Sequence, residues 1–297
     1  MQYLDEEEVR TRLTYETLIP AVERALVDLS DKKIQQPVRS VLRVGEGFFA
    51  LMPAVDEDLM GVKLVTFYER NTGFPTHQAV NQLLSAKTGE PLVAMDGRLI
   101  TEMRTAAVSA IATRLFASQG AQTLAILGSG VQARSHLRAL NTVRTFKEVR
   151  VWSRTLANAQ RFADEVGAIA FPTPEQAVRG ADVVLGLASV REPLILGHWL
   201  GPETLVCAVA TVTPDRRELD DAAMNAAIVV ESREAALRES GDIIGSRTPV
   251  YAEIGEILAG VKPLPKGRVV LKSLGVAACD LAAAGVVWRS LQSQLSA

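Results

Sequence analysis

The segment from residue 123 to residue 133 constrains the fold of this chain more than any other. Thr123–Leu127 has the apolar, strand-forming character of a buried strand, and it runs directly into the turn Gly128-Ser129-Gly130-Val131-Gln132-Ala133, after which the residues favour a helix. In this G-x-G-x-x-A pattern the first glycine permits a tight turn, the second lets the backbone approach a pyrophosphate, and the small alanine lets helix and strand pack closely. The segment therefore predicts a Rossmann-type unit that binds a pyridine dinucleotide, with all six turn residues in the cofactor site.

Short apolar strands alternate with helices from this point onward. Further strands are expected at residues 149–152, 168–171, 183–187, 205–209 and 228–231. This alternation is typical of parallel strands joined by helical crossovers. We therefore expect an α/β fold in which residues 116–278 form a doubly wound parallel sheet.

The first 115 residues follow a mixed pattern instead. Here we expect a helix at residues 15–29, a helix that starts near Thr101, strands at 38–44, 48–52 and 61–67, and a hairpin of residues 77–85 and 91–95. A final helical segment, residues 280–295, is expected to return to this α+β region. The sequence therefore predicts a second domain that combines residues 1–115 with residues 279–297.

Composition and charge narrow the choice of partners. The net charge is −2 with the signs interspersed, so no basic face is available for nucleic acid or for a membrane surface. Residues 1–10 are acidic where a secretory signal would be basic and then apolar. Cys207 and Cys279 lie far apart in the sequence, and with only three histidines a zinc site is not expected. We expect a cytoplasmic protein with a small-molecule partner and no metal.

The residues after the second expected strand indicate which dinucleotide is preferred. Ser153-Arg154-Thr155 stands where the adenine ribose of a bound dinucleotide would lie, and it contains no Asp or Glu. An NAD-selective site has a carboxylate there, whereas a guanidinium and two hydroxyls can bind a 2′-phosphate. The segment therefore predicts that NADPH is preferred over NADH. The alternative is a solvated loop arginine beside a hydroxyl that caps the next helix.

Two basic residues occupy apolar positions. With Thr101 as the N-cap, Arg104 falls in the first helical turn, on the same stripe as Ala107 and Ile111. Its partner is either a substrate carboxylate or a structural carboxylate; we expect the substrate, because a carboxylate at that helix end would block the site. Lys63 interrupts a strand that is apolar on both faces. It is either a proton donor with a lowered pKa or one half of a structural pair.

Several motifs spread over nearly the whole chain are specific. They include Gln36-Pro37-Val38-Arg39, Lys63-Leu64-Val65-Thr66-Phe67-Tyr68, Thr76-His77-Gln78-Ala79, Arg104-Thr105-Ala106-Ala107, the glycine turn, Trp152-Ser153-Arg154-Thr155, Glu239-Ser240-Gly241-Asp242 and Lys272-Ser273-Leu274-Gly275. Together they resemble the ornithine cyclodeaminase and mu-crystallin family, and within it the NADPH-dependent ketimine reductases.

The resemblance assigns roles to individual residues. It implies a homodimer in which the N-terminal region and the last helix form a domain for substrate binding and dimerisation. It implies that Arg39, Lys63 and Arg104 face the substrate carboxylate or its reacting centre. His77 matches a position near the active site, although a packed histidine would explain it equally well. The resemblance also implies that two further segments contact the cofactor, namely Ala210-Thr211-Val212 and Ser273-Leu274-Gly275.

Three departures from the family pattern bear on the chemistry. Val212 stands where ornithine cyclodeaminases carry a catalytic aspartate, and valine cannot move a proton. Ala210 replaces a glycine, which alters how closely its loop can approach the nicotinamide. Cys279-Asp280 replaces an acidic pair and leaves Asp280 as a single carboxylate that we expect to be catalytic.

The resemblance implies reduction of a cyclic ketimine carboxylate, such as pyrroline-2-carboxylate or piperideine-2-carboxylate, with NADPH. Reductive amination of an open-chain 2-oxo acid is an alternative, because the same carboxylate-binding residues and cofactor would serve it. A thyroid-hormone-binding or structural protein is another alternative, although it would not need Arg39, Lys63 and Arg104 together. Ornithine cyclodeamination is disfavoured by Val212 and by the NADP-type loop.

Overall fold

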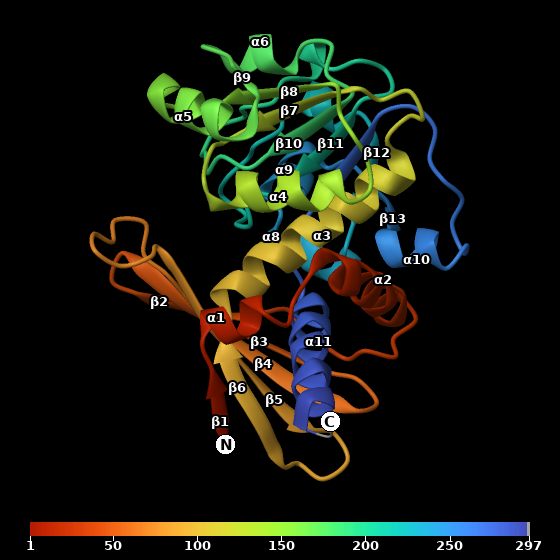
Figure 1. Ribbon diagram of the computed structural model, residues 1–297. Coiled ribbons are helices and arrows are strands. Elements are labelled where there is room, and N and C mark those ends of the chain that lie inside the picture. Colours follow the sequence, from red (N-terminus) through yellow and green to blue (C-terminus); the bar gives the residue numbers. More distant parts are fainter. Residues whose placement is uncertain (296–297) are drawn as a thin grey trace. The chain divides into compact units, whose positions relative to one another are not determined.

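The computed structural model describes residues 1–295 and divides the chain into two compact units (Figure 1). Unit 1 contains Met1–Ala107 and the segment from Gly275 onward, and unit 2 is Val108–Leu274. The expected boundaries, after residues 115 and 278, lie inside the helices α3 (Arg98–Phe116) and α11 (Ala277–Leu295). Since α3 is one continuous helix shared by both units, no loop marks the first boundary in the sequence.

Unit 1 is built on a six-stranded sheet with the strand order β1-β6-β5-β4-β3-β2. Its strands are β1 (Gln2–Leu4), β2 (Ser40–Val44), β3 (Gly47–Val55), β4 (Leu59–Phe67), β5 (His77–Ser85) and β6 (Pro91–Asp96). The sheet is antiparallel except where β1 pairs with β6. The strands and the hairpin expected from the sequence are confirmed, except that β2 starts two residues later than expected, and the three-residue β1 was not anticipated.

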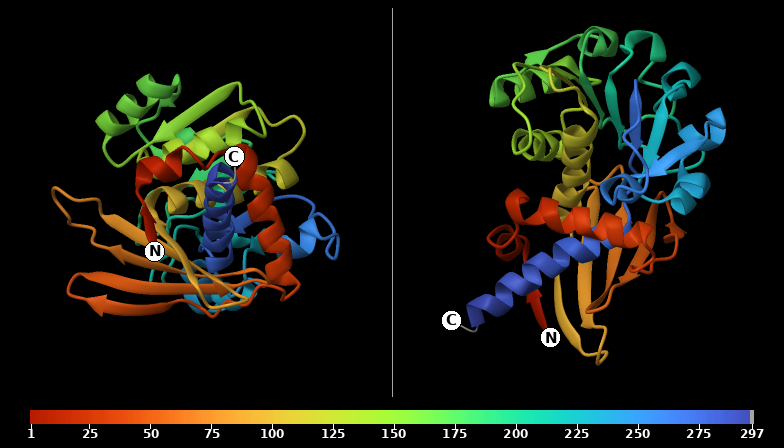
Figure 2. Two further views of the ribbon diagram at one scale, coloured as in Figure 1. Left: turned by 60° about the horizontal axis from the view of Figure 1, so that its bottom comes forward. Right: turned by 90° about the vertical axis from the view of Figure 1, so that its right-hand side faces the viewer.

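Three helices belong wholly to unit 1: α1 (Glu6–Arg10), α2 (Tyr15–Ser30) and α11. The expected helix at residues 15–29 is thus confirmed, and α2 and α11 lie side by side (Figure 2). Helix α11 packs on β3, β4 and β5, and it therefore covers the sheet face that carries Lys63, Val65, Ala79 and Asn81. No helix within residues 1–295 is long and apolar enough to cross a membrane.

Unit 2 is built on an eight-stranded, wholly parallel sheet with the order β13-β12-β14-β11-β10-β7-β8-β9. Its strands are β7 (Thr123–Leu127), β8 (Glu148–Trp152), β9 (Ile169–Ala170), β10 (Val183–Gly186), β11 (Leu205–Ala208), β12 (Ala227–Val230), β13 (Val250–Glu253) and β14 (Val269–Lys272). The expected doubly wound α/β fold is confirmed. The sequence pattern did not reveal β13 and β14, which are four residues long and end in charged side chains.

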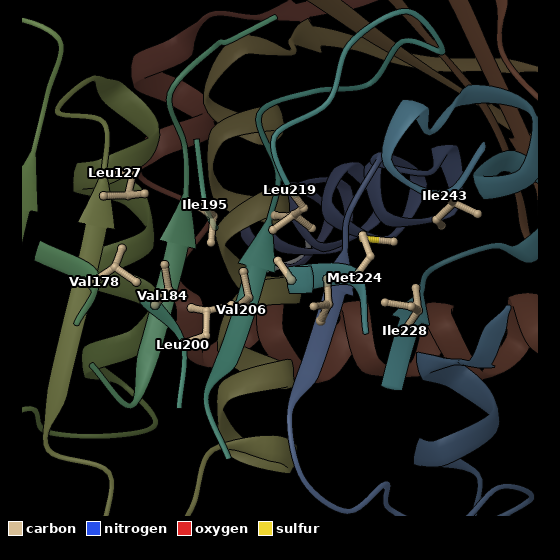
Figure 3. Close-up of a cluster of buried hydrophobic side chains, with 14 of the residues drawn as sticks. Leu127, Val178, Val184, Ile195, Leu200, Val206, Leu219, Met224, Ile228 and Ile243 are labelled. Atoms are coloured by element: carbon tan, nitrogen blue, oxygen red, sulfur yellow. The ribbon is translucent and has the colours of Figure 1, made fainter. Parts of the chain in front are cut away.

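The connections between these strands carry eight helices that are shorter than α3. They are α4 (Val131–Asn141), α5 (Leu156–Val166), α6 (Pro174–Val178), the 3-10 helix η1 (Gly197–Trp199), α7 (Asp221–Met224), α8 (Arg233–Glu239), α9 (Gly241–Ser246) and α10 (Ile254–Leu258). One sheet face packs against apolar residues of α6, α7, α8 and α9 (Figure 3). On the other face, burial raises the pKa of Cys207 to about 12, although a hydrogen bond with Ser109 of α3 opposes the shift. Both faces are buried, as a parallel sheet requires.

Candidate active site

The glycine turn between β7 and α4 has the geometry that the sequence predicts. Gly128 has φ +124°, and a Cβ there would lie 2.9 Å from the backbone carbon of Leu187, so only glycine fits. Gly130 is the N-cap of α4, no side chain among the described residues caps that helix, and a Cβ on Gly130 would meet no atom within 4 Å. Uncapped amides and open space at a helix N-terminus are what a pyrophosphate requires.

The other turn residues support the same site in different ways. Ala133 is fully buried, which lets α4 approach the sheet closely, whereas Val131 is half exposed. The hydroxyl of Ser129 lies 3.1 Å from that of Ser153, and this contact links the turn to the residues after β8. The carbonyl oxygen of Gln132 lies 2.8 Å from Nδ1 of His136, inside the first turns of α4.

Arg154 and Thr155 are exposed at the end of β8. Thr155 occupies the N-cap position of α5, but its side chain makes no capping hydrogen bond. Within residues 1–295 the Arg154 guanidinium makes no hydrogen bond or ion pair. The alternative is therefore correct in that Arg154 is exposed and Thr155 stands at the N-cap, and wrong in that the Thr155 hydroxyl makes no capping bond; phosphate binding by these residues stays a prediction.

Four charged side chains gather inside unit 1. Asp280, from the first turn of α11, lies between Lys63 of β4 and Arg104 of α3: the Lys63 ammonium is 2.9 Å from Oδ2, and Arg104 Nε is 3.1 Å from Oδ1. All three side chains are at most 6% exposed. The Arg39 guanidinium, which donates to the carbonyl of Gly275 at 2.8 Å, is close enough to influence Lys63. We call these four residues the charge cluster.

Two expectations about Arg104 are wrong. Helix α3 begins at Arg98, so Thr101 is not its N-cap but a residue inside it, and Arg104 lies beyond the first turn. The expectation that no carboxylate pairs with Arg104 is also wrong, because Asp280 does so. Asp280 comes from a helix 176 positions later in the chain, and no local pattern indicates that contact. The expected strand at residues 38–44 is shorter as well: β2 starts at Ser40, and Arg39 precedes it.

The cluster has an excess of positive charge, and this changes the titration of its members. Burial, reinforced by Arg104 and Arg39, lowers the pKa of Lys63 from 10.5 to about 8, although Asp280 opposes the shift. Burial alone would raise the pKa of Asp280, but Arg104 and Lys63 outweigh it, and the pKa lies below its usual value. Burial and the same two cations lower the pKa of His77 to about 4, so His77 is neutral at physiological pH.

Gly275 lies against the charge cluster in the structure. Its φ is +73°, and a Cβ there would lie 2.4 Å from Nη1 of Arg104. Glycine is thus required both by the backbone and by the guanidinium beside it. The resemblance assigned Gly275 to the cofactor site, which stays a prediction; in the structure its carbonyl accepts from Arg39 and its Cα lies against Arg104.

Sequence reasoning missed Asn81, which is paired in register with Lys63 and is therefore its neighbour on the same sheet face. Asn81 is 3% exposed, and within the described residues its amide nitrogen makes no hydrogen bond. The available signal was the alternation of the strand: Asn81 lies two residues from Ala79 and from Leu83, and therefore on the same apolar face. The side chain lies beside Lys63 on the sheet face that α11 covers.

The two segments expected to contact the cofactor both follow strands of unit 2. Ala210, Thr211 and Val212 come after β11, where Thr211 is buried and Val212 half-buried. Ser273 and Leu274 come after β14, and both donate to the buried carboxylate of Glu231, at 2.7 Å each. Parallel strands present these ends at one edge of the sheet, the edge at which doubly wound sheets bind their ligands.

A doubly wound sheet with a glycine turn, joined to an α+β unit that holds a buried charge cluster, defines an α/β protein of the Rossmann class. Residues 2–294 match the sequence model of the ornithine cyclodeaminase/mu-crystallin family. The chain belongs to the ornithine cyclodeaminase/mu-crystallin family, and the resemblance seen in the motifs is confirmed.

Individual relatives align with the whole chain. Ketimine reductase mu-crystallin of Mus musculus is 45% identical over 305 residues, covering 98% of this chain and 97% of that protein. The structure of Thermococcus litoralis Delta(1)-pyrroline-2-carboxylate reductase, in complex with NADH and L-proline, superimposes with a TM-score of 0.94 at 32% identity and covers 99% of this chain and 98% of that one. An archaeal alanine dehydrogenase dimer with bound NAD also has a TM-score of 0.94, at 29% identity, with coverages of 99% and 97%.

Removing the Asp280 carboxylate should destabilise the fold and lower the pKa of Lys63 below 8. In Asp280→Asn two buried cations lose their shared partner, and breaking a buried pair in this way costs about 3 to 5 kcal/mol. Urea unfolding measures the first effect, and NMR titration of the lysine side chain measures the second. Asp58→Asn, which breaks an ion pair whose side chains are 70% exposed, is the control and should leave stability nearly unchanged. Equal urea midpoints for the two variants would contradict the assignment.

Proposed function

We propose that this protein reduces a cyclic ketimine carboxylate, such as pyrroline-2-carboxylate or piperideine-2-carboxylate, to the cyclic amino acid with NADPH. The observation that carries the proposal is the charge cluster: Lys63 and Arg104 share the carboxylate of Asp280, and Arg39 lies close enough to influence Lys63. Guanidinium and ammonium groups brought together in this way can bind a carboxylate through charge-assisted hydrogen bonds, so an anionic substrate fits the cluster.

Each member of the cluster has a task in the reaction. Arg39 and Arg104 bind the substrate carboxylate and orient the ring, since guanidinium groups form charge-assisted bonds with carboxylates. Lys63 donates a proton to the ring nitrogen, which makes the imine carbon electrophilic. Asp280 orients the Lys63 ammonium and keeps its pKa from falling further. The neutral His77 adds no competing charge.

Residues of unit 2 fit the cofactor. The uncapped start of α4 and the space at Gly130 would hold the pyrophosphate, and Ser153, Arg154 and Thr155 would hold a 2′-phosphate. When bound, NADPH supplies the hydride that the imine carbon accepts. Val212, in place of an aspartate, suits a reaction in which this loop transfers no proton.

The relatives support the reaction class. The mouse relative is named a ketimine reductase, and the Thermococcus structure holds NADH together with L-proline, the product of reducing a five-membered cyclic imine carboxylate. The similarity to alanine dehydrogenase keeps reductive amination of a 2-oxo acid as the second candidate. The two are separated by comparing NADPH oxidation with a preformed cyclic imine against pyruvate plus ammonia or methylamine.

Imine reduction should depend on the protonated form of Lys63. Since its pKa is about 8, the protonated fraction falls as pH rises through that value, and kcat/KM for the imine should fall with it. Lys63→Met should lower kcat/KM by about 100-fold or more and abolish this alkaline decline. Rates of NADPH oxidation across the pH range measure both. Lys87→Met, which removes a 70% exposed lysine, is the control. An unchanged pH profile in Lys63→Met would exclude Lys63 as the proton donor.

NADPH should bind more tightly than NADH by about one to two orders of magnitude, as expected for one or two charge-assisted bonds to the 2′-phosphate. Arg154→Ala should remove most of the difference by weakening NADPH binding while NADH binding stays the same. Calorimetric titration with each cofactor measures this. Arg161→Ala, an exposed arginine further along α5, is the matched control. Equal affinities in the unmodified protein would refute the preference.

The protein should also form a homodimer through unit 1. Strand β2 is an exposed edge strand, and Val41, Leu42 and Val44 are 49%, 58% and 46% exposed on it, an apolar edge that a second subunit would cover. Light scattering should therefore give the mass of a dimer, and Leu42→Asp should shift it toward the monomer. Leu237→Asp, at a leucine of unit 2 that is 57% exposed, should not. A monomeric mass for the unmodified protein at micromolar concentration would contradict the proposal.

A further inference from the structure

Lys272, at the end of β14, is a fully buried lysine of unit 2. Its ammonium contacts three side chains: Glu218, Asp242 at 2.9 Å and the hydroxyl of Thr211 at 3.1 Å. Glu218 and Asp242 are also buried, at 1% and 0% exposure. The resemblance placed Lys272 and Asp242 in motifs, but the reaction described above uses neither.

The two carboxylates of this group hold backbone amides that follow β11. One oxygen of Glu218 accepts from the amide and the hydroxyl of Thr211, at 3.2 and 3.0 Å, and the other accepts from the amide of Ala210 at 3.4 Å. Asp242 in turn accepts from the amides of Glu218 and Leu219, at 2.9 Å each. The loop at residues 210–211 is therefore fastened to α9 and to β14 through three buried charges.

The loop at residues 210–211 lies at the edge of the sheet where the glycine turn also lies. Ala208 and Lys272 are paired in register at the carboxyl ends of β11 and β14, the same edge of the sheet at which Gly128 follows β7. The Glu218 carboxylate also packs against Gly186 at the end of β10, where a Cβ would lie 2.7 Å from it. A dinucleotide whose pyrophosphate lies at the glycine turn and whose adenosine lies toward β8 extends its other half over β10 and β11.

A purely structural role does not require this chemistry. Buried ammonium and carboxylate groups lose their hydration, and apolar residues of similar volume stabilise a core equally well or better. Burial and the neighbouring Asp242 raise the pKa of Glu218, although Lys272 opposes the shift. What apolar residues cannot do is accept hydrogen bonds from three groups of one loop and hold that loop in a single shape.

We propose that Lys272, Glu218 and Asp242 are positioning residues that hold the Ala210–Thr211 loop in the shape that receives the nicotinamide half of the cofactor. The proposal rests on the dinucleotide binding proposed above. It concerns the nicotinamide half alone, because the glycine turn and Arg154 serve the other half.

The test compares two probes: NADPH, and 2′-phospho-ADP-ribose, which keeps every part of NADPH except the nicotinamide. Glu218→Gln places an NH₂ group against the loop amides in place of one carboxylate oxygen and leaves the Lys272–Asp242 pair intact. In this variant the Kd for NADPH should rise about tenfold, as for one lost bond to a charged group, while the Kd for the fragment stays within about twofold. Cofactor KM should rise and kcat fall, with the imine KM unchanged.

Thr211 provides a second pair of variants that leave no buried charge unpaired. Thr211→Val should reproduce the selective loss of NADPH affinity, and Thr211→Ser, which keeps the hydroxyl, should restore it. Asp182→Asn is the control: Asp182 accepts from the amides of Gln122 and Thr123, at 2.7 and 2.9 Å, at the opposite edge of the sheet. It should leave the ratio of the two Kd values unchanged.

The outcomes separate the two proposals. If the unmodified protein binds neither probe, the dinucleotide assignment fails. If it binds both, and Glu218→Gln and Thr211→Val change the two Kd values equally or not at all, the positioning role is wrong. A selective loss of NADPH affinity in both variants supports it.

Discussion

The Asp280 carboxylate is the interaction on which unit 1 depends. It is buried beside two cations, and without it Lys63 and Arg104 would repel each other in a site with little water to screen them. One carboxylate holds both cations in place. Burial, with Arg104 and Arg39 nearby, lowers the pKa of Lys63 into the range where it can exchange a proton, and Asp280 limits that shift. Stability and chemistry therefore arise from the same contact.

Unit 2 contains a second group of buried charges, in which carboxylates outnumber cations. Around Lys272 two carboxylates surround one ammonium, and their remaining acceptors hold backbone amides. Asp280 is shared by two cations, whereas Glu218 and Asp242 share one ammonium and accept hydrogen bonds from backbone amides as well. In both cases a charge removed from water is compensated by fixed partners.

The sequence predicted the dinucleotide unit well because its information is local. A strand, a glycine turn and a helix follow one another within residues 123–141, and the steric demand at Gly128 is visible in the residue itself. The hairpin of β5 and β6 was equally local. Strands β13 and β14 were missed although they are no shorter than β10, β11 and β12, and it is their pairing with β12 and β11 in the sheet that reveals them.

By itself, the sequence determined the α/β class, the glycine turn, the absence of a carboxylate at residues 153–155 and the inward direction of Arg104. The resemblance added Arg39 and the family. Only the tertiary structure decided what Arg104 contacts, because its partner is on a helix at the far end of the chain. It also decided that Gly275 lies against Arg104 and that Glu218, Asp242 and Lys272 meet. The physical reason is the same throughout. A glycine turn or a basic residue in an apolar pattern can be recognised from its neighbours in the sequence, whereas the partner of a buried charge depends on how distant segments pack.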